Sequence, residues 1–116
     1  MSGRVDQAPD PRAGSPYRVE LDAVPWRRPV DGMRYKETCR RGRRIRLAEY
    51  EPEMVPHWCE EGHSGYVLHG RLEVEFADRT VVFEAGDGIV IPGGSEHRHR
   101  GRALSDVVRV VYVEDV

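Results

Sequence analysis

Residues 86–97 read GDGIVIPGGSEH, and this stretch does more than any other to decide the fold. Its opening glycine and aspartate fit a tight turn, and the apolar IVI that follows has the length of a short strand. Pro92 ends that strand at a position where no backbone donor is needed, and the two glycines after it allow backbone conformations closed to other residues. The stretch therefore predicts a turn, a short strand and a sharp corner that leads His97 into the next strand.

Alternation of apolar and polar residues, the pattern of half-buried strands, dominates the chain from residue 33 onward. The clearest case is residues 71–76, RLEVEF, where Leu72, Val74 and Phe76 point one way and the charged residues point the other. The turn ADRT then leads into VVFEA, which completes a predicted hairpin. Similar alternation appears in residues 43–50, 64–70 and 107–113. Many short strands with regularly spaced turns, and no window with helical spacing, predict an all-β sandwich or barrel.

The length of 116 residues suits one compact domain, being large enough for a core but too short for two. The first 16 residues contain three prolines and almost no apolar periodicity, which is typical of an extended or mobile arm. The segment VELDAVPW, residues 19–26, supplies apolar anchors that we expect to pack against the domain. We therefore predict a flexible N-terminal arm over residues 1–18 and one β-barrel domain over residues 19–116.

The charge balance and the cysteine count exclude several classes of protein. The chain has 18 basic and 20 acidic residues, a formal charge of −2, so we expect neither nucleic acid nor an anionic membrane as a partner. No apolar run approaches the ~20 residues that cross a bilayer, and the first residues lack the apolar middle of a secretory signal. Cys39 and Cys59 are too few for a disulfide framework. We expect a cytoplasmic protein with free thiols.

Metal-capable side chains are concentrated between residues 57 and 99, where all five histidines lie. His57 and Cys59 are two residues apart, so on an extended strand they share a face and reach one ion. A reversal at the following EEG would bring His63 back beside them, and one ligand from a neighbouring strand would complete a tetrahedron. His97 is the best candidate for that fourth ligand. The spacing thus predicts a metal site of His57, Cys59, His63 and His97.

The corner sequence resembles the second motif of the cupins, G-x5-P-x-G-x2-H-x3-N. Four residues stand at the intervals that this motif requires: Gly86, Pro92, Gly94 and His97. Gly101 occupies the position where asparagine is usual, and that asparagine is not a metal ligand in the family. The spacing rarely coincides by chance, so the resemblance implies a cupin-type double-stranded β-helix, or jelly-roll barrel, over about residues 45–113.

The first cupin motif, G-x5-H-x-H-x3,4-E-x6-G, is matched with substitutions. His57 and the closing Gly70 are in register, whereas Cys59 takes the place of the second histidine and His63 that of the glutamate. The run HWCEEGHSGYVLHG looks similar to a subgroup of small bacterial cupins with tryptophan beside this cysteine. Imidazole and thiolate donors suit zinc, nickel, cobalt or copper better than manganese or magnesium. Zinc is the first choice, and iron is less attractive because a thiolate beside activated oxygen is oxidisable.

Three functions stay open at this point. The wider family implies a metal-dependent enzyme of isomerase, lyase or oxygenase type, acting on a small metabolite in the barrel mouth. The alternative is a non-catalytic module that binds a small ligand or holds structural zinc, since four protein ligands would close a tetrahedral site. A third option makes Cys59 a nucleophile activated by His57 or His97. A carboxylate or tyrosine near an open metal position would favour the enzyme.

The two remaining histidines and the assembly state complete the expectations. His99 could share the face of His97, but its place outside the motif favours a position at the rim or behind the ligands. The sequence leaves open whether His69 points into the cavity or to solvent. The apolar residues 107–113 and the segment 19–26 could form a two-fold interface, so we expect a homodimer.

Overall fold

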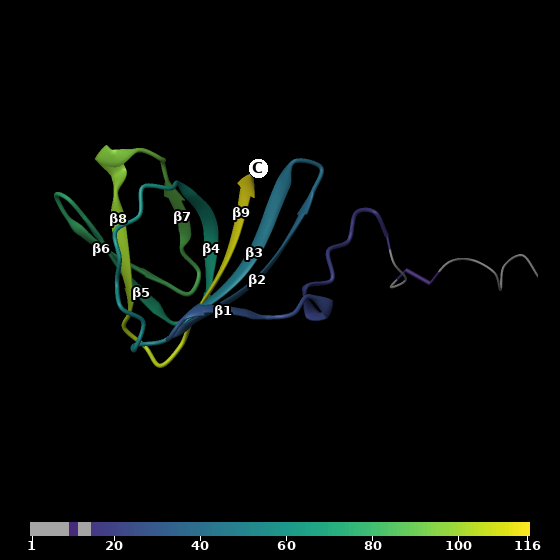
Figure 1. The fold of residues 1–116 in the computed structure, drawn as a ribbon, viewed down its shortest axis with the longest axis horizontal. Helices are drawn as coiled ribbons and strands as arrows, with labels where there is room; N and C mark the ends of the chain where they lie inside the picture. Colours follow the sequence, from purple (N-terminus) through teal and green to yellow (C-terminus); the bar gives the residue numbers. More distant parts are fainter. Residues whose placement is uncertain (1–9, 12–14) are drawn as a thin grey trace, which may run out of the picture.

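The computed structural model describes residues 10, 11 and 15–116, which form two antiparallel sheets facing each other (Figure 1). The larger sheet has the order β1 (Arg27–Val30), β2 (Met33–Arg40), β3 (Arg43–Tyr50), β9 (Val108–Asp115), β4 (His63–His69) and β7 (Gly88–Ile91). The smaller sheet has the order β6 (Thr80–Glu84), β5 (Arg71–Phe76) and β8 (His99–Ala103). The predicted all-β jelly-roll barrel is confirmed. Most of the arm predicted over residues 1–18 lies outside the described residues.

The core lies between the two sheets and is built from the inward positions of the alternating strands. Leu72 and Val74 of β5 are buried, as the alternation in RLEVEF predicts. Both sheets contribute to one apolar cluster: Ala48, Val67, Leu72, Val74, Ile89, Ile91, Ala103, Val108, Val110 and Tyr112. Since every second residue of a strand faces the same side, the polar residues between them remain at the outer surface.

Strand β9 lies inside the larger sheet, paired with β3 on one side and β4 on the other. Its inward residues Val108 and Val110 are fully buried, while Val113 on its outer face is exposed. Apolar residues on both faces are typical of a strand in the interior of a sheet. The segment 107–113 therefore offers a face, and not an edge, to any interface.

Trp26, just before β1, packs against the outer face of β2. The Arg34 guanidinium lies 3.9 Å from its ring centroid and the Lys36 ammonium 4.6 Å, and Lys36 is buried beneath it. Arg34 also pairs with the buried Glu49 of β3 at 2.7 Å. Trp26, one of the apolar anchors predicted in the segment 19–26, therefore joins that segment to β2.

The corner after β7 differs in one respect from its predicted form. Gly94 has a φ of 119°, a conformation that favours glycine, and the chain then makes one 3-10 turn, η2 (Ser95–His97). Strand β8 begins only at His99, so His97 stays in the turn. A second 3-10 turn, η1, spans Leu21–Ala23. Within the described residues, no helix is long and apolar enough to span a membrane.

Candidate metal centre

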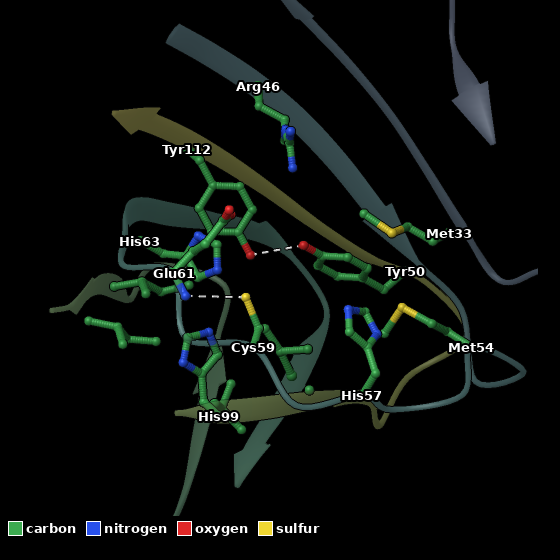
Figure 2. Close-up of a pocket in the computed structure, with 15 residues that line it drawn as sticks. Met33, Arg46, Tyr50, Met54, His57, Cys59, Glu61, His63, His99 and Tyr112 are labelled. Carbon is green, nitrogen blue, oxygen red and sulfur yellow. Dashed lines mark hydrogen bonds between the residues drawn. The ribbon is translucent and has the colours of Figure 1, made fainter. Parts of the chain in front are cut away.

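A cavity of ≈ 210 Å³ lies between the sheets, bounded by inward side chains of both sheets and by the loop from β3 to β4. Three histidines and one cysteine line it: His57, Cys59, His63 and His99 (Figure 2). His57 and Cys59 come from the loop, His63 is the first residue of β4, and His99 is the first of β8. Segments distant in the sequence thus meet at one end of the barrel.

Three of these residues form a compact cluster. One ligand atom from each of Cys59, His63 and His99 lies within 4.8 Å of the others. Atoms that bind one zinc ion at about 2.0–2.3 Å are separated by distances of this order, after small adjustments of the side chains. The cluster therefore has the chemistry and the approximate spacing of a three-residue metal site.

Backbone pairing brings Cys59 and His99 together. The Cys59 N–H donates to the His99 carbonyl at 2.8 Å, and the His99 N–H donates to the Cys59 carbonyl at 2.9 Å. Glu61 N–H donates to Cys59 Sγ at 3.4 Å, which orients the sulfur (Figure 2). The loop before β4 is thereby attached to the first residue of β8, and the side chains of Cys59 and His99 both line the cavity.

The tautomer of His99 is fixed by its neighbour. Its Nδ1 lies 3.0 Å from the carbonyl oxygen of His97, which can only accept, so Nδ1 carries the proton. In the neutral ring Nε2 is then the acceptor, and it is buried with no hydrogen-bond partner among the described residues. A buried polar atom without a partner is costly, and a metal ion would satisfy it.

His63 has a second buried nitrogen of this kind. Its Nδ1 has no hydrogen-bond partner in the described part of the chain, and Glu114 Oε1 lies 3.6 Å away. Burial lowers the pKa of His63, the Glu114 carboxylate raises it, and His99 lowers it again, with a net lowering. The imidazole is therefore neutral at pH 7, the form that binds metals.

The structure does not bring all four sequence-predicted ligands together. His57 lines the cavity but stands outside the cluster, and His97 is not among the lining residues. The His97 side chain is 42% exposed, with Nε2 3.8 Å from Glu96. Because β8 begins two residues later than the motif spacing implies, His99 occupies the position expected for His97. His69 is exposed at the far end of β4.

Two tyrosines form a part of the cavity that the sequence analysis did not single out. The hydroxyls of Tyr50 and Tyr112 are 3.0 Å apart (Figure 2). Burial raises the pKa of Tyr50 and raises that of Tyr112 well above its ordinary value, so both stay protonated. Tyr50 lies two residues after the core residue Ala48, and Tyr112 lies two residues after Val110, so strand alternation places both side chains on the inner face. This alternation is the sequence signal that could have identified them.

Comparisons with known proteins agree with the architecture. A protein of unknown function from Rhizobium leguminosarum has a TM-score of 0.68 at 19% identity, over 83% of this chain and 92% of its own. KdgF from Halomonas has a TM-score of 0.62 at 24% identity, over 79% and 87%. A cupin-2 domain protein from Shewanella frigidimarina has a TM-score of 0.56 at 24% identity, over 68% and 76%. These likenesses support the fold alone.

The sequence itself identifies the family. No curated protein matches the chain. The family described as the cupin domain matches residues 45–114, which is more than half of the sequence and includes both motifs discussed above. The chain therefore belongs to the cupin domain family.

Proposed function

We propose that the protein binds a divalent metal ion, preferably zinc, through Cys59, His63 and His99. It acts on a small metabolite that binds in the cavity beside this ion. The observation that carries this proposal is the buried Nε2 of His99, which lacks a hydrogen-bond partner within the described residues. The proton of this ring is held on the other nitrogen by the His97 carbonyl. Ligating histidines are held in one tautomer in this way.

The donor set favours zinc and an incomplete coordination shell. One thiolate and two imidazoles suit zinc, and nickel, cobalt, copper or iron are the alternatives that metal analysis separates. Three protein ligands leave a position for a water molecule or a substrate, as in catalytic zinc sites. His57 lines the same cavity outside the cluster, so it is free to hold or accept a proton.

The lining of the cavity favours an enzyme over a closed structural site. Tyr50, Tyr112 and Glu61 line it together with the cluster, so groups that donate or accept protons face the space for a ligand. Bound zinc would supply a Lewis acid that polarises an oxygen atom of the metabolite. The protein's own part is to position that metabolite and to handle protons at the His57 imidazole and the tyrosine hydroxyls.

The test is metal analysis of the protein purified without added metal, together with two histidine variants. We expect about one zinc ion per chain in the natural protein. His99→Ala should lose most of the metal and melt at a lower temperature, because an ion that binds only the folded state adds its binding energy to folding. His97→Ala is the matched control, since it removes the same group two residues away and keeps the backbone carbonyl that holds His99.

The reverse result would contradict this assignment. If metal content and melting temperature fell with His97→Ala and not with His99→Ala, the ligand would be the histidine of the second cupin motif. A natural protein without any bound metal, and without affinity for zinc on titration, would remove the proposal altogether.

We also infer a homodimer that forms through the outer face of the larger sheet. Exposed apolar side chains of three neighbouring strands, β9, β4 and β7, gather there: Tyr66, Leu68, Val90 and Val113. We call these four residues the outer patch. Contiguous exposed apolar surface marks interaction sites. The cytoplasmic location and the absence of a nucleic-acid partner stay predictions.

A further inference from the structure

Hydrogen-bond donors form the wall of the cavity opposite Cys59 and His99, and this wall adjoins His63, whose ring centroid lies 5.1 Å from that of Tyr112. Arg46 and Tyr50 come from β3, and Tyr112 comes from β9, directly opposite Arg46 in the strand pairing. Figure 2 shows Arg46 and the two tyrosines toward one side of the cavity, with Cys59 and His99 toward the other. One side of the cavity therefore offers hydrogen-bond donors, and the other offers a thiol and an imidazole that can bind a metal ion.

The tyrosine pair has one hydroxyl proton more than its own hydrogen bond uses. One hydroxyl donates to the other across 3.0 Å, and the second hydroxyl keeps its proton free for another acceptor. Both tyrosines line the cavity, so whichever hydroxyl keeps this proton needs an acceptor inside the cavity or loses a hydrogen bond. An acceptor atom of a ligand would be that partner.

Arg46 adds a positive charge to the same wall. Its Nε and Nη2 contact Glu37 Oε2 at 3.1 and 3.0 Å, and its guanidinium carbon lies 4.4 Å from the centroid of the Tyr35 ring. These contacts hold the group in place. No hydrogen bond or ion pair within the described residues reaches Nη1, which leaves two N–H donors for a ligand.

The size and the charge of the cavity restrict the ligand further. Its volume of ≈ 210 Å³ lies below the roughly 300–1,000 Å³ of pockets for drug-sized ligands, which favours a small metabolite. Glu61 lines the cavity and Glu37 balances part of the charge of Arg46, so this wall offers less than one full positive charge, which suits one carboxylate better than two. A neutral ligand would leave the charged donor without its best partner.

We propose that the cavity takes a small monocarboxylic acid, with the carboxylate against Arg46 and the Tyr50–Tyr112 pair and the rest of the molecule directed toward the Cys59–His63–His99 cluster. This inference rests on the proposed function in one respect, that the cavity is the ligand site. It deepens that function by assigning the class of metabolite and the residues that select it.

The test measures the affinity of the zinc-loaded full chain for 4-oxopentanoate by calorimetry or by ligand-observed NMR. This acid carries a carboxylate at one end and a carbonyl oxygen at the other, and 4-oxopentanamide is its neutral counterpart of the same shape. We expect the natural protein to bind the acid at least about tenfold more tightly than the amide, because a charge-assisted hydrogen bond contributes about 1.5–3 kcal/mol. This comparison needs no variant, so it does not depend on how a variant folds.

Variants then assign the effect to the donor wall. Arg46→Gln should weaken binding of the acid by about 10- to 100-fold and leave binding of the amide and the zinc content unchanged. Arg102→Gln is the matched control, because Arg102 pairs with Glu73 on the smaller sheet and does not line the cavity. Equal affinity for acid and amide, or equal loss in both variants, would overturn the proposal.

The outcomes separate this proposal from the metal site. Selective binding of the acid through Arg46 in a protein that takes up no zinc would support the carboxylate site and contradict the metal site. A zinc-loaded protein that binds the acid no better than the amide would keep the metal site and contradict the carboxylate site.

Discussion

The carbonyl oxygen of His97 gives the side chain of His99 its role. By accepting the Nδ1 proton at 3.0 Å it leaves the Nε2 lone pair toward the cavity. The motif histidine thus contributes through its backbone, and the histidine two residues on supplies the buried ring. A histidine with the opposite tautomer would present an N–H to the cluster and would not bind a metal ion.

The two cysteines provide a probe of the site within one molecule. If Cys59 is a ligand, its thiolate is protected by the ion, so a thiol reagent should modify it slowly in the zinc-loaded protein and quickly after chelation. Cys39 is exposed on β2 and should react at the same rate in both states. Mass spectrometry of the labelled peptides measures both rates. Unchanged labelling of Cys59 on chelation would count against ligation.

Alternation alone could not choose between His97 and His99. The two residues have the same phase, so a strand through both would turn both rings to one face. The choice depends on where the corner ends, and η2 retains His97. The alternation of apolar and polar residues did identify Leu72 and Val74 as core residues, because which face of a strand a residue occupies depends only on its neighbours in the sequence. The contact between Cys59 and His99 joins distant segments, and no local pattern carries it.

The loop before β4 is held by close contacts with the corner after β7. Gly94 N–H donates to the Glu60 carbonyl at 2.9 Å, and Gly62 lies against Gly93 and Ile91. These contacts fix the path of the chain between Cys59 and His63, the two proposed ligands nearest in sequence. The loop of the first motif and the corner of the second are therefore in direct backbone contact.

Gly62→Ala should disturb this junction. A Cβ at Gly62 would lie 2.8 Å from both the Gly93 nitrogen and the Ile91 oxygen, so backbone must shift. We expect a loss of roughly 1–3 kcal/mol in the free energy of unfolding, as for other overpacked positions, and weaker zinc binding because His63 follows directly. Calorimetric melting and zinc titration measure the two effects.

Gly88→Ala is the control for this substitution. A Cβ at Gly88 would have its nearest contact at 3.8 Å, an ordinary van der Waals distance, and this glycine begins β7 on the same sheet. We expect little change in melting temperature or zinc affinity. Equal behaviour of the two variants would mean that the junction does not position the ligands.

At the scale of the whole molecule, the outer patch is an apolar surface on the larger sheet. Val90 is 83% exposed there, on the edge strand β7. The fold was predictable as a barrel from strand pattern and motif, but the assignment of residues 107–113 to the sheet interior required the order of the strands. That order depends on which distant segments pair, as β9 does with β3 and β4.

Val90→Glu should separate the inferred homodimer. In a two-fold interface the new carboxylate occurs twice, so burial and like-charge repulsion both oppose association. Light scattering at micromolar concentration should show a dimer for the natural protein and a monomer for this variant. Val82→Glu on β6 is the control, because Val82 is an exposed apolar residue of the smaller sheet. A natural protein that is monomeric at that concentration would contradict the inference.

The paired backbones of Cys59 and His99 have a further effect on how the cavity is reached. Two hydrogen bonds and, under the proposed function, one ion join the same two residues across the barrel mouth. Local opening of residues 59–62 would then break the hydrogen bonds and eject the ion together. The free zinc concentration would set the population of the open mouth, so metal supply would govern access for molecules too large to enter while the bridge is intact.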